Sequence, residues 1–224
     1  MRPVEPPRTV VVLAKEPVPG RVKTRLAPRV GPEGAADAAA AALADTLDAV
    51  AALPVHRVLV LDGAPGPWVP PGFDVLPQTG GGLDRRLAGA FDDVLRRHPG
   101  PVLLVGMDTP QLAPTLAAVD LHGHDAVLGM AEDGGFWAVG LRSGDRALLD
   151  GLFVGVPMSE PTTGAAQLAR LRAHGLDVGL LPTLRDVDGP DDARAVAAQA
   201  PASRFARRWR ELDAATATGA GSAS

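Results

Sequence analysis

Short apolar runs alternate along the chain with longer segments in which apolar residues recur at helical spacing. Residues 9–14 and 101–106 form continuously apolar runs, the first of them rich in β-branched side chains. Such runs are typical of strands that are buried on both faces of a parallel sheet. Shorter runs predict five further strands at residues 57–61, 73–76, 125–131, 136–141 and 178–181.

The segments between these strands predict helices. Residues 32–53 are rich in alanine, begin with a proline and end before Pro54, which favours one long helix. A second helix is indicated by apolar residues that share one helical face, namely Leu83, Leu87, Phe91, Val94 and Leu95. Further helices are expected at 114–119 and 162–174, with two short ones near the end. Strands that alternate with helices predict βαβ units and an α/β fold with a mainly parallel sheet.

The size of the chain favours one domain, because 224 residues suffice for one well-buried α/β core and are few for two. We expect the domain to span residues 9–213, with flexible termini at 1–8 and 214–224. The C-terminal segment consists of small and polar residues, which is typical of disorder.

Charge and composition narrow the function classes. A net charge of −4 argues against a nucleic-acid partner, so a phosphate site would have to be a local basic patch. The absence of cysteine excludes disulfides, thiolate metal sites and cysteine nucleophiles. The N-terminal segment 1–8 has an acidic residue and three prolines where a signal peptide would need an apolar stretch, and no later apolar run is long enough to span a bilayer. We therefore expect a cytoplasmic protein without a membrane partner.

A basic loop follows the first predicted strand. Lys15, Arg21, Lys23 and Arg25 place four cations within eleven residues, and such a loop can bind a polyphosphate. A merely solvated loop has the same composition, and the cluster alone does not decide between the two. The loop is not a Walker A motif, because Val22 stands where that motif requires glycine.

Several carboxylates are candidates for a metal site. Asp108 follows the strand at 101–106, and ligands of parallel sheets bind at the carboxyl ends of strands. It could bind Mg²⁺, or it could simply cap the next helix. Asp186 and Asp188 are the candidates for a second carboxylate, although the latter also suits a turn.

The segment 132–135 (Glu-Asp-Gly-Gly) can be a tight hairpin turn or a place where a ligand approaches the backbone closely. The five histidines are scattered without partner ligands, and we assign them no role. Ser159 lies in no nucleophile-elbow pattern, which leaves serine hydrolase chemistry without support.

Four segments in order, 14–28, 106–110, 132–136 and 186–192, resemble the radical-SAM/selenodomain-associated transferase family. The resemblance covers about residues 9–197. It implies the GT-A, nucleotide-diphospho-sugar transferase fold, a three-layer sandwich with a mainly parallel central sheet. The sequence departs from the family pattern in three places: at Met107 and Thr109, at Phe136–Trp137 and at Met158–Ser159–Glu160.

Lys23–Thr24–Arg25–Leu26 is also similar to a segment of 2-phospholactate guanylyltransferases that meets the nucleoside triphosphate. The resemblance implies catalytic roles for Lys23, Arg25 and Asp108, and a Mg²⁺ or Mn²⁺ site on Asp108 and Asp188. The acceptor side would contain Asp133, Gly134 and Gly135. The residues implied to bind the nucleotide are Ala14, Lys15, Gly20, Lys23, Thr24, Arg25 and Gln78.

Three functions remain in competition. The first is nucleotidyl transfer from a nucleoside triphosphate to a small phosphorylated acceptor, with release of pyrophosphate. The second is glycosyl transfer from a nucleotide sugar, although Asp108 belongs to no Asp-X-Asp triplet. The third is a nucleotide-binding module without catalysis. The expected partners are a nucleotide donor and a small-molecule acceptor, and a homodimer is left open.

Overall fold

The computed structural model describes residues 8–220 and contains a seven-stranded sheet. The strands are β1 (Thr9–Lys15), β2 (His56–Asp62), β3 (Phe73–Pro77), β4 (Val102–Gly106), β5 (Ala126–Ala131), β6 (Phe136–Leu141) and β7 (Val178–Leu184). Their order is β3-β2-β1-β4-β6-β5-β7. Only β6 runs antiparallel to its neighbours, and every other pair in the described sheet is parallel. All seven predicted strands are confirmed.

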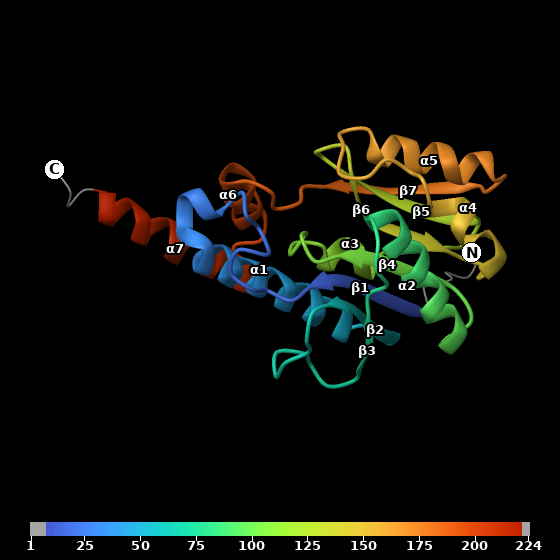
Figure 1. The fold of residues 1–224 in the computed structure, drawn as a ribbon, viewed down its shortest axis with the longest axis horizontal. Coiled ribbons are helices and arrows are strands. Elements are labelled where there is room, and N and C mark those ends of the chain that lie inside the picture. The colour runs from blue at the N-terminus through green and yellow to red at the C-terminus, as the bar shows by residue number, and fades with distance from the viewer. Residues whose placement is uncertain (1–7, 221–224) are drawn as a thin grey trace.

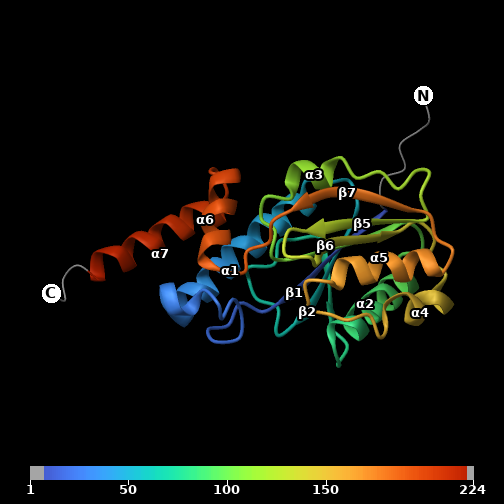
Figure 2. The same cartoon turned by 90° about the horizontal axis from the view of Figure 1, so that it is seen from above.

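Helices cover both faces of this sheet, because its strands are apolar on both faces (Figures 1 and 2). Val10 and Val12 pack with α1 (Ala27–Ala51) and α3 (Ala113–Ala117) on one face. Val11 points to the other face, where α2 (Leu83–Arg97), α4 (Leu149–Phe153) and α5 (Thr163–Ala173) pack. The predicted α/β fold with three layers and a mainly parallel sheet is therefore confirmed.

Helix α1 starts earlier than residue 32, because a first turn precedes a kink. Gly31 has a φ of 74°, outside the helical region, and Pro32 begins the continuous part. Proline lacks the N–H that an interior helical position would use, so it suits the start of a helix.

A lobe of helices lies beside the sheet, formed by α6 (Pro190–Gln199), α7 (Arg204–Ala220) and the start of α1 (Figure 1). Phe205 and Trp209 of α7 are about 1% exposed and pack against the outer face of α1. The expected disorder from residue 214 is corrected, because α7 continues to Ala220. Alanine favours helix, and the Thr216 hydroxyl donates to the Leu212 carbonyl instead of breaking the turn.

The termini expected to be flexible fall mostly on residues 1–7 and 221–224, which lie outside the described residues. Arg8 is described, and its backbone N–H donates to the Pro101 carbonyl at 2.9 Å. Sequence patterns also missed the short helices η1 (Arg146–Leu148) and α4. These elements contribute only three and five residues, too few to show a helical period.

The strand order reverses between β1 and β4, at the position where open α/β sheets form a binding crevice. From β1 the chain moves outward to β2 and β3, and it then returns to the other side of β1 as β4. The two strands are parallel, so their carboxyl ends meet at one edge of the sheet. Ligands of open α/β sheets bind at such a reversal. None of the helices in the described part of the chain combines the length and apolar character that a membrane span requires.

Candidate active site

Lys23 lies at this carboxyl edge of the sheet, beside the residues that follow β4 and β7. Its side chain is only 8% exposed, and its Nζ lies 2.8 Å from Asp108 Oδ1 and 3.9 Å from Asp188 Oδ1. The ammonium also donates to the backbone carbonyl of Val187. Lys23 has a φ of +47°, a left-handed conformation that is uncommon outside glycine and is often found at functional sites. The backbone is thus held in a strained form that directs a cation between two carboxylates.

Arg25 adds a second cation from the same loop. Its Nη1 lies 2.8 Å from Asp188 Oδ2, and its side chain is 76% exposed. The segment that carries Asp188 is tied to the end of β4, because the Val187 N–H donates to the Asp108 carbonyl at 2.9 Å. The structure thus brings together four predicted site residues, Lys23, Arg25, Asp108 and Asp188, from three segments that are far apart in sequence.

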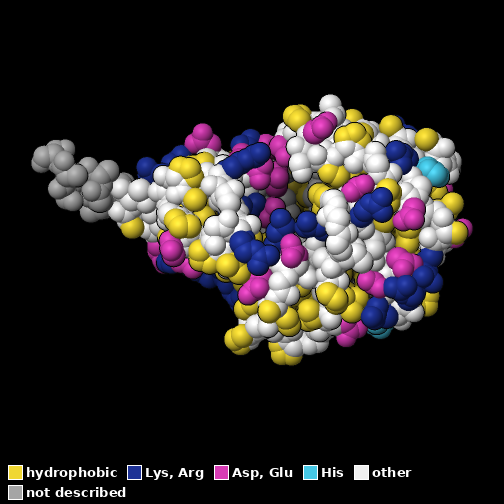
Figure 3. Space-filling view, in the orientation of Figure 1, with side chains coloured by type: hydrophobic (Ala, Val, Ile, Leu, Met, Phe, Trp, Pro, Cys, Tyr) yellow, Lys and Arg dark blue, Asp and Glu magenta, His cyan; other side chains and the backbone are white. Residues whose placement is uncertain are grey.

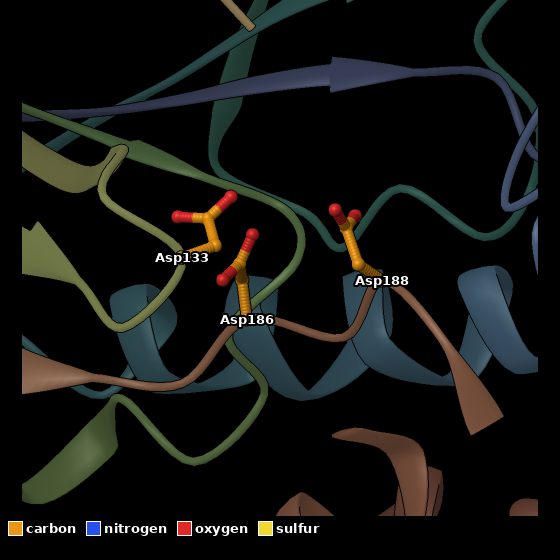
Figure 4. A group of neighbouring side chains, drawn as sticks. All are labelled: Asp133, Asp186 and Asp188. Atoms are coloured by element: carbon orange, nitrogen blue, oxygen red, sulfur yellow. The ribbon is translucent and has the colours of Figure 1, made fainter. Parts of the chain in front are cut away.

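Three carboxylates form an acidic cluster beside this pair of cations. Asp133, Asp186 and Asp188 each offer an oxygen within 4.8 Å of the other two. Figure 4 shows that Asp133 comes from the turn between β5 and β6, whereas the other two come from the segment after β7. Burial raises the pKa of Asp186 to about 6, with further contributions from the negative charges of Asp133 and Asp188. Within the described residues Asp133 and Asp186 form no ion pair, whereas Asp188 is paired with Lys23 and Arg25. The cluster therefore carries negative charge that these two cations offset only in part.

The chemistry of this cluster fits a divalent cation. Mg²⁺ and Mn²⁺ prefer carboxylate oxygens, and close carboxylates that repel one another gain most from a shared cation. The predicted metal pair was Asp108 and Asp188, and of these only the latter belongs to the cluster. Asp108 is instead the partner of Lys23. In the sequence, Asp186 was one of two candidates for the second metal-binding carboxylate. Asp133 was expected on the acceptor side.

The turn that carries Asp133 is packed tightly against the start of α5. The carboxylate of Asp133 accepts from the Gly135 N–H at 2.8 Å. The Gly134 carbonyl accepts from the Gly164 N–H, also at 2.8 Å. Arg185 then joins the end of β5 to the segment after β7, because its Nη2 lies 2.5 Å from Glu132 Oε2. These contacts fix the positions of Asp133 and of the segment 186–188.

Replacement of Gly134 by alanine is expected to destabilise the fold by about 2–4 kcal/mol. Gly134 has a φ of +91°, and an added Cβ would lie 1.9 Å from the Pro161 carbonyl oxygen. Chemical denaturation measures this loss. Gly80→Ala is the matched control, since a Cβ there meets nothing within 4 Å, and a loss equal to that of the control would contradict the packing described.

The remaining predicted nucleotide-binding residues lie at or just after the carboxyl ends of β1 and β3. Gln78 Nε2 donates to the Ala14 carbonyl at 2.6 Å, which joins the end of β3 to β1. Lys15, the last residue of β1, is exposed, as are Gly20 and Thr24 on the loop that follows. In the space-filling view, basic and acidic side chains gather around a hollow between the helical lobe and the sheet (Figure 3).

Comparison with solved structures defines the class to which this fold and crevice belong. A candidate nucleotide-diphospho-sugar transferase from Desulfovibrio desulfuricans G20 is 26% identical, with a TM-score of 0.81 over 94% of this chain and 96% of that one. The inositol-1-phosphate CTP transferase from T. maritima is 12% identical, with a TM-score of 0.52 over 88% and 96%. A cytidylyltransferase from Leptospira borgpetersenii is 10% identical, with a TM-score of 0.51 over 94% and 96%. The chain thus has the nucleotide-diphospho-sugar transferase-like fold.

The chain belongs to the DUF2064 family, described as uncharacterized proteins conserved in bacteria. The family model matches residues 36–160, more than half of the chain. The comparison with curated proteins finds no match.

Proposed function

We propose that this protein is a metal-dependent transferase that uses a nucleotide donor. Its reaction is nucleotidyl transfer from a nucleoside triphosphate to a small phosphorylated acceptor, with release of pyrophosphate. The observation that carries the proposal is the position of Lys23, between Asp108 and Asp188 at the carboxyl ends of the strands. The sequence motifs also favour kinship with the radical-SAM/selenodomain-associated transferases and with 2-phospholactate guanylyltransferases.

The donor phosphates bind along the loop after β1. Lys23 and Arg25 neutralise the triphosphate, and the exposed Lys15 adds charge at the entrance. The nucleoside lies toward Ala14 and Gln78, which are joined by a hydrogen bond. The relative with 26% identity is itself a candidate nucleotide-diphospho-sugar transferase, which supports a nucleotide donor.

Asp133, Asp186 and Asp188 would hold the divalent cation, Mg²⁺ or Mn²⁺. When bound, the cation offsets negative charge on the phosphate oxygens during transfer. Asp108 acts on the other side, where it holds the Lys23 ammonium in place.

In the transfer step, an oxygen of the acceptor phosphate forms a bond to the α-phosphorus of the donor. The bond from that phosphorus to the bridging oxygen of the β-phosphate breaks, and pyrophosphate leaves with the electron pair. The nucleophile is already anionic, so no general base is needed. Lys23 and Arg25 stabilise the charge on the departing pyrophosphate, and this kind of electrostatic stabilisation dominates phosphoryl transfer.

A second candidate is glycosyl transfer from a nucleotide sugar. It is favoured by the same relative, which is named for nucleotide-diphospho-sugars and matches nearly the whole chain. In this case the cation and the basic loop hold the diphosphate leaving group. The acceptor attacks the anomeric carbon in place of phosphorus.

A thermal-shift panel separates the two functions. We expect one nucleoside triphosphate, in the presence of Mg²⁺, to raise the melting temperature, since a ligand at ~100 times its Kd adds about 2.7 kcal/mol of stability. Asp188→Asn should remove the dependence on Mg²⁺. Stabilisation by nucleotide sugars alone would favour glycosyl transfer, and no stabilisation by any donor would refute both functions.

A further inference from the structure

Both oxygens of the Asp188 carboxylate face cations of the loop after β1. Oδ1 lies 3.9 Å from the Lys23 ammonium, and Oδ2 lies 2.8 Å from Arg25 Nη1. The same carboxylate supplies one of the three oxygens of the acidic cluster. A divalent cation in that cluster must therefore compete with Lys23 and Arg25 for Asp188.

The position of Lys23 is built into the fold. Its side chain is 8% exposed and its backbone is left-handed. An ammonium has three N–H donors. Asp108 and the Val187 carbonyl lie within hydrogen-bond distance of this one, whereas Asp188, at 3.9 Å, is an ion-pair partner beyond that distance. An incoming phosphate that approaches the ammonium therefore competes most directly with Asp188, the more weakly held of the two carboxylates.

We propose that Lys23 and Arg25 occupy Asp188 in the free protein and release it when a polyphosphate binds to them. This inference rests on the proposed function, because it concerns the same donor and the same cation. It makes the binding of donor phosphates and the binding of the divalent cation mutually dependent. By linkage, each ligand strengthens the binding of the other by the same factor. The free protein therefore binds a divalent cation weakly, and the complete site forms only around the donor.

The test is the affinity for Mn²⁺ alone, without nucleotide, measured by the electron paramagnetic resonance of the free ion. Lys23→Met should bind Mn²⁺ roughly tenfold more tightly than the wild type, a factor within the usual range of coupling between sites. Arg25→Met should show a smaller gain of about two- to threefold, because an exposed ion pair is screened by water.

Lys15→Met is the matched control. It removes the same charge from the end of β1, just before that loop, and Lys15 makes no ion pair with any described residue. Its effect on Mn²⁺ affinity measures the general loss of positive charge, and only the gain beyond that control supports the inference. Asp186→Asn should abolish Mn²⁺ binding in all backgrounds, which locates the ion in the acidic cluster.

The outcomes separate this inference from the proposed function. If the wild type binds Mn²⁺ and Lys23→Met gains no more than Lys15→Met, the competition for Asp188 is refuted while the metal site stands. If no variant binds Mn²⁺ at millimolar concentrations, the metal site fails and the competition fails with it. Melting curves verify that each variant is folded. Arg25→Met changes a largely exposed side chain, so it keeps the test decisive even if Lys23→Met does not fold.

Discussion

Lys23→Met is expected to lower kcat/KM for the donor triphosphate by about 10²–10³-fold, the usual cost of removing one preorganised group that stabilises transition-state charge. The ammonium is held by Asp108 before the donor arrives, so it needs little reorganisation during the reaction. Steady-state pyrophosphate release measures the effect. The loss should appear in kcat as well as in KM, because charge on the leaving group develops in the transition state.

Arg172→Met is the control for this experiment. Arg172 is exposed on α5 near the helix end that leads to the start of β7, at the sheet edge opposite to the crevice. Its replacement removes the same charge from the protein and should leave kcat/KM within about twofold of the wild type, as for a distant surface change. An equally small effect of Lys23→Met would contradict the role of Lys23. A loss of folded protein would lower both the transfer rate and Mn²⁺ binding. Slower transfer together with tighter Mn²⁺ binding in Lys23→Met therefore cannot result from unfolding.

The opposite effects on the metal and on the reaction follow from one contact. In the free protein, Lys23 offsets part of the negative charge of Asp188. In the complex with the donor, the same ammonium offsets phosphate charge, and the cation takes over the carboxylates. A protein that keeps Asp188 paired until the donor binds limits the unpaired negative charge of the acidic cluster. The raised pKa of Asp186 indicates how unfavourable such charge is where no partner reaches it.

The strands and the crevice could be predicted from sequence because their signals are local. A continuous apolar run such as that of β1 identifies a strand buried on both faces. Once β1 and β4 are taken as parallel neighbours, the residues that follow them must meet at one edge. The proximity of Lys23 and Asp108 follows from this geometry.

The composition of the acidic cluster could not be predicted in the same way. β6 enters the sheet between β4 and β5 and runs antiparallel to both. This pairing is a long-range contact that no apolar period encodes. It determines where the β5–β6 turn lies, and therefore brings Asp133 beside Asp186. In sequence the Asp-Gly-Gly segment suited either a tight turn or a close approach of a ligand, and its packing against Pro161 could not be foreseen.

The residues alone left Asp186 and Asp188 open as alternatives, and the resemblance selected Asp188, whereas the structure places both in the cluster. The two residues flank Val187, which is about 1% exposed and packs among the helices of the lobe. The apolar Val187 predicts burial of this segment, but it does not indicate which of the two neighbouring aspartates is also buried. Only the packed structure reveals that burial raises the pKa of Asp186. The second large predicted effect, on stability, depends on this burial.

Asp186→Asn is expected to stabilise the metal-free protein at neutral and alkaline pH and to abolish stabilisation by Mn²⁺. The pKa of Asp186 is raised from its ordinary 3.8 to about 6, mainly by burial. Between these values the folded state binds more protons than the unfolded state, so wild-type stability falls as the pH rises. Above about pH 7 the full penalty applies, and it is roughly 1–3 kcal/mol at about 1.4 kcal/mol for each pKa unit. Asparagine carries no charge and should escape this penalty.

Chemical denaturation in the presence of a chelator, at pH 4 and at pH 8, measures the difference between the two proteins. The gain in stability from Asp186→Asn should be small at pH 4, where the wild-type carboxyl is protonated, and complete at pH 8.

Asp133→Asn is the matched control, because it also removes a carboxylate from the cluster but its side chain is exposed. It should weaken Mn²⁺ binding with a much smaller gain in stability. Equal stability of Asp186→Asn and the wild type at pH 8 would show that the ionised carboxylate has adequate partners without metal. A gain in metal-free stability combined with a loss of the Mn²⁺ response would mean that the fold maintains an unfavourable charge at this position because the cation requires it.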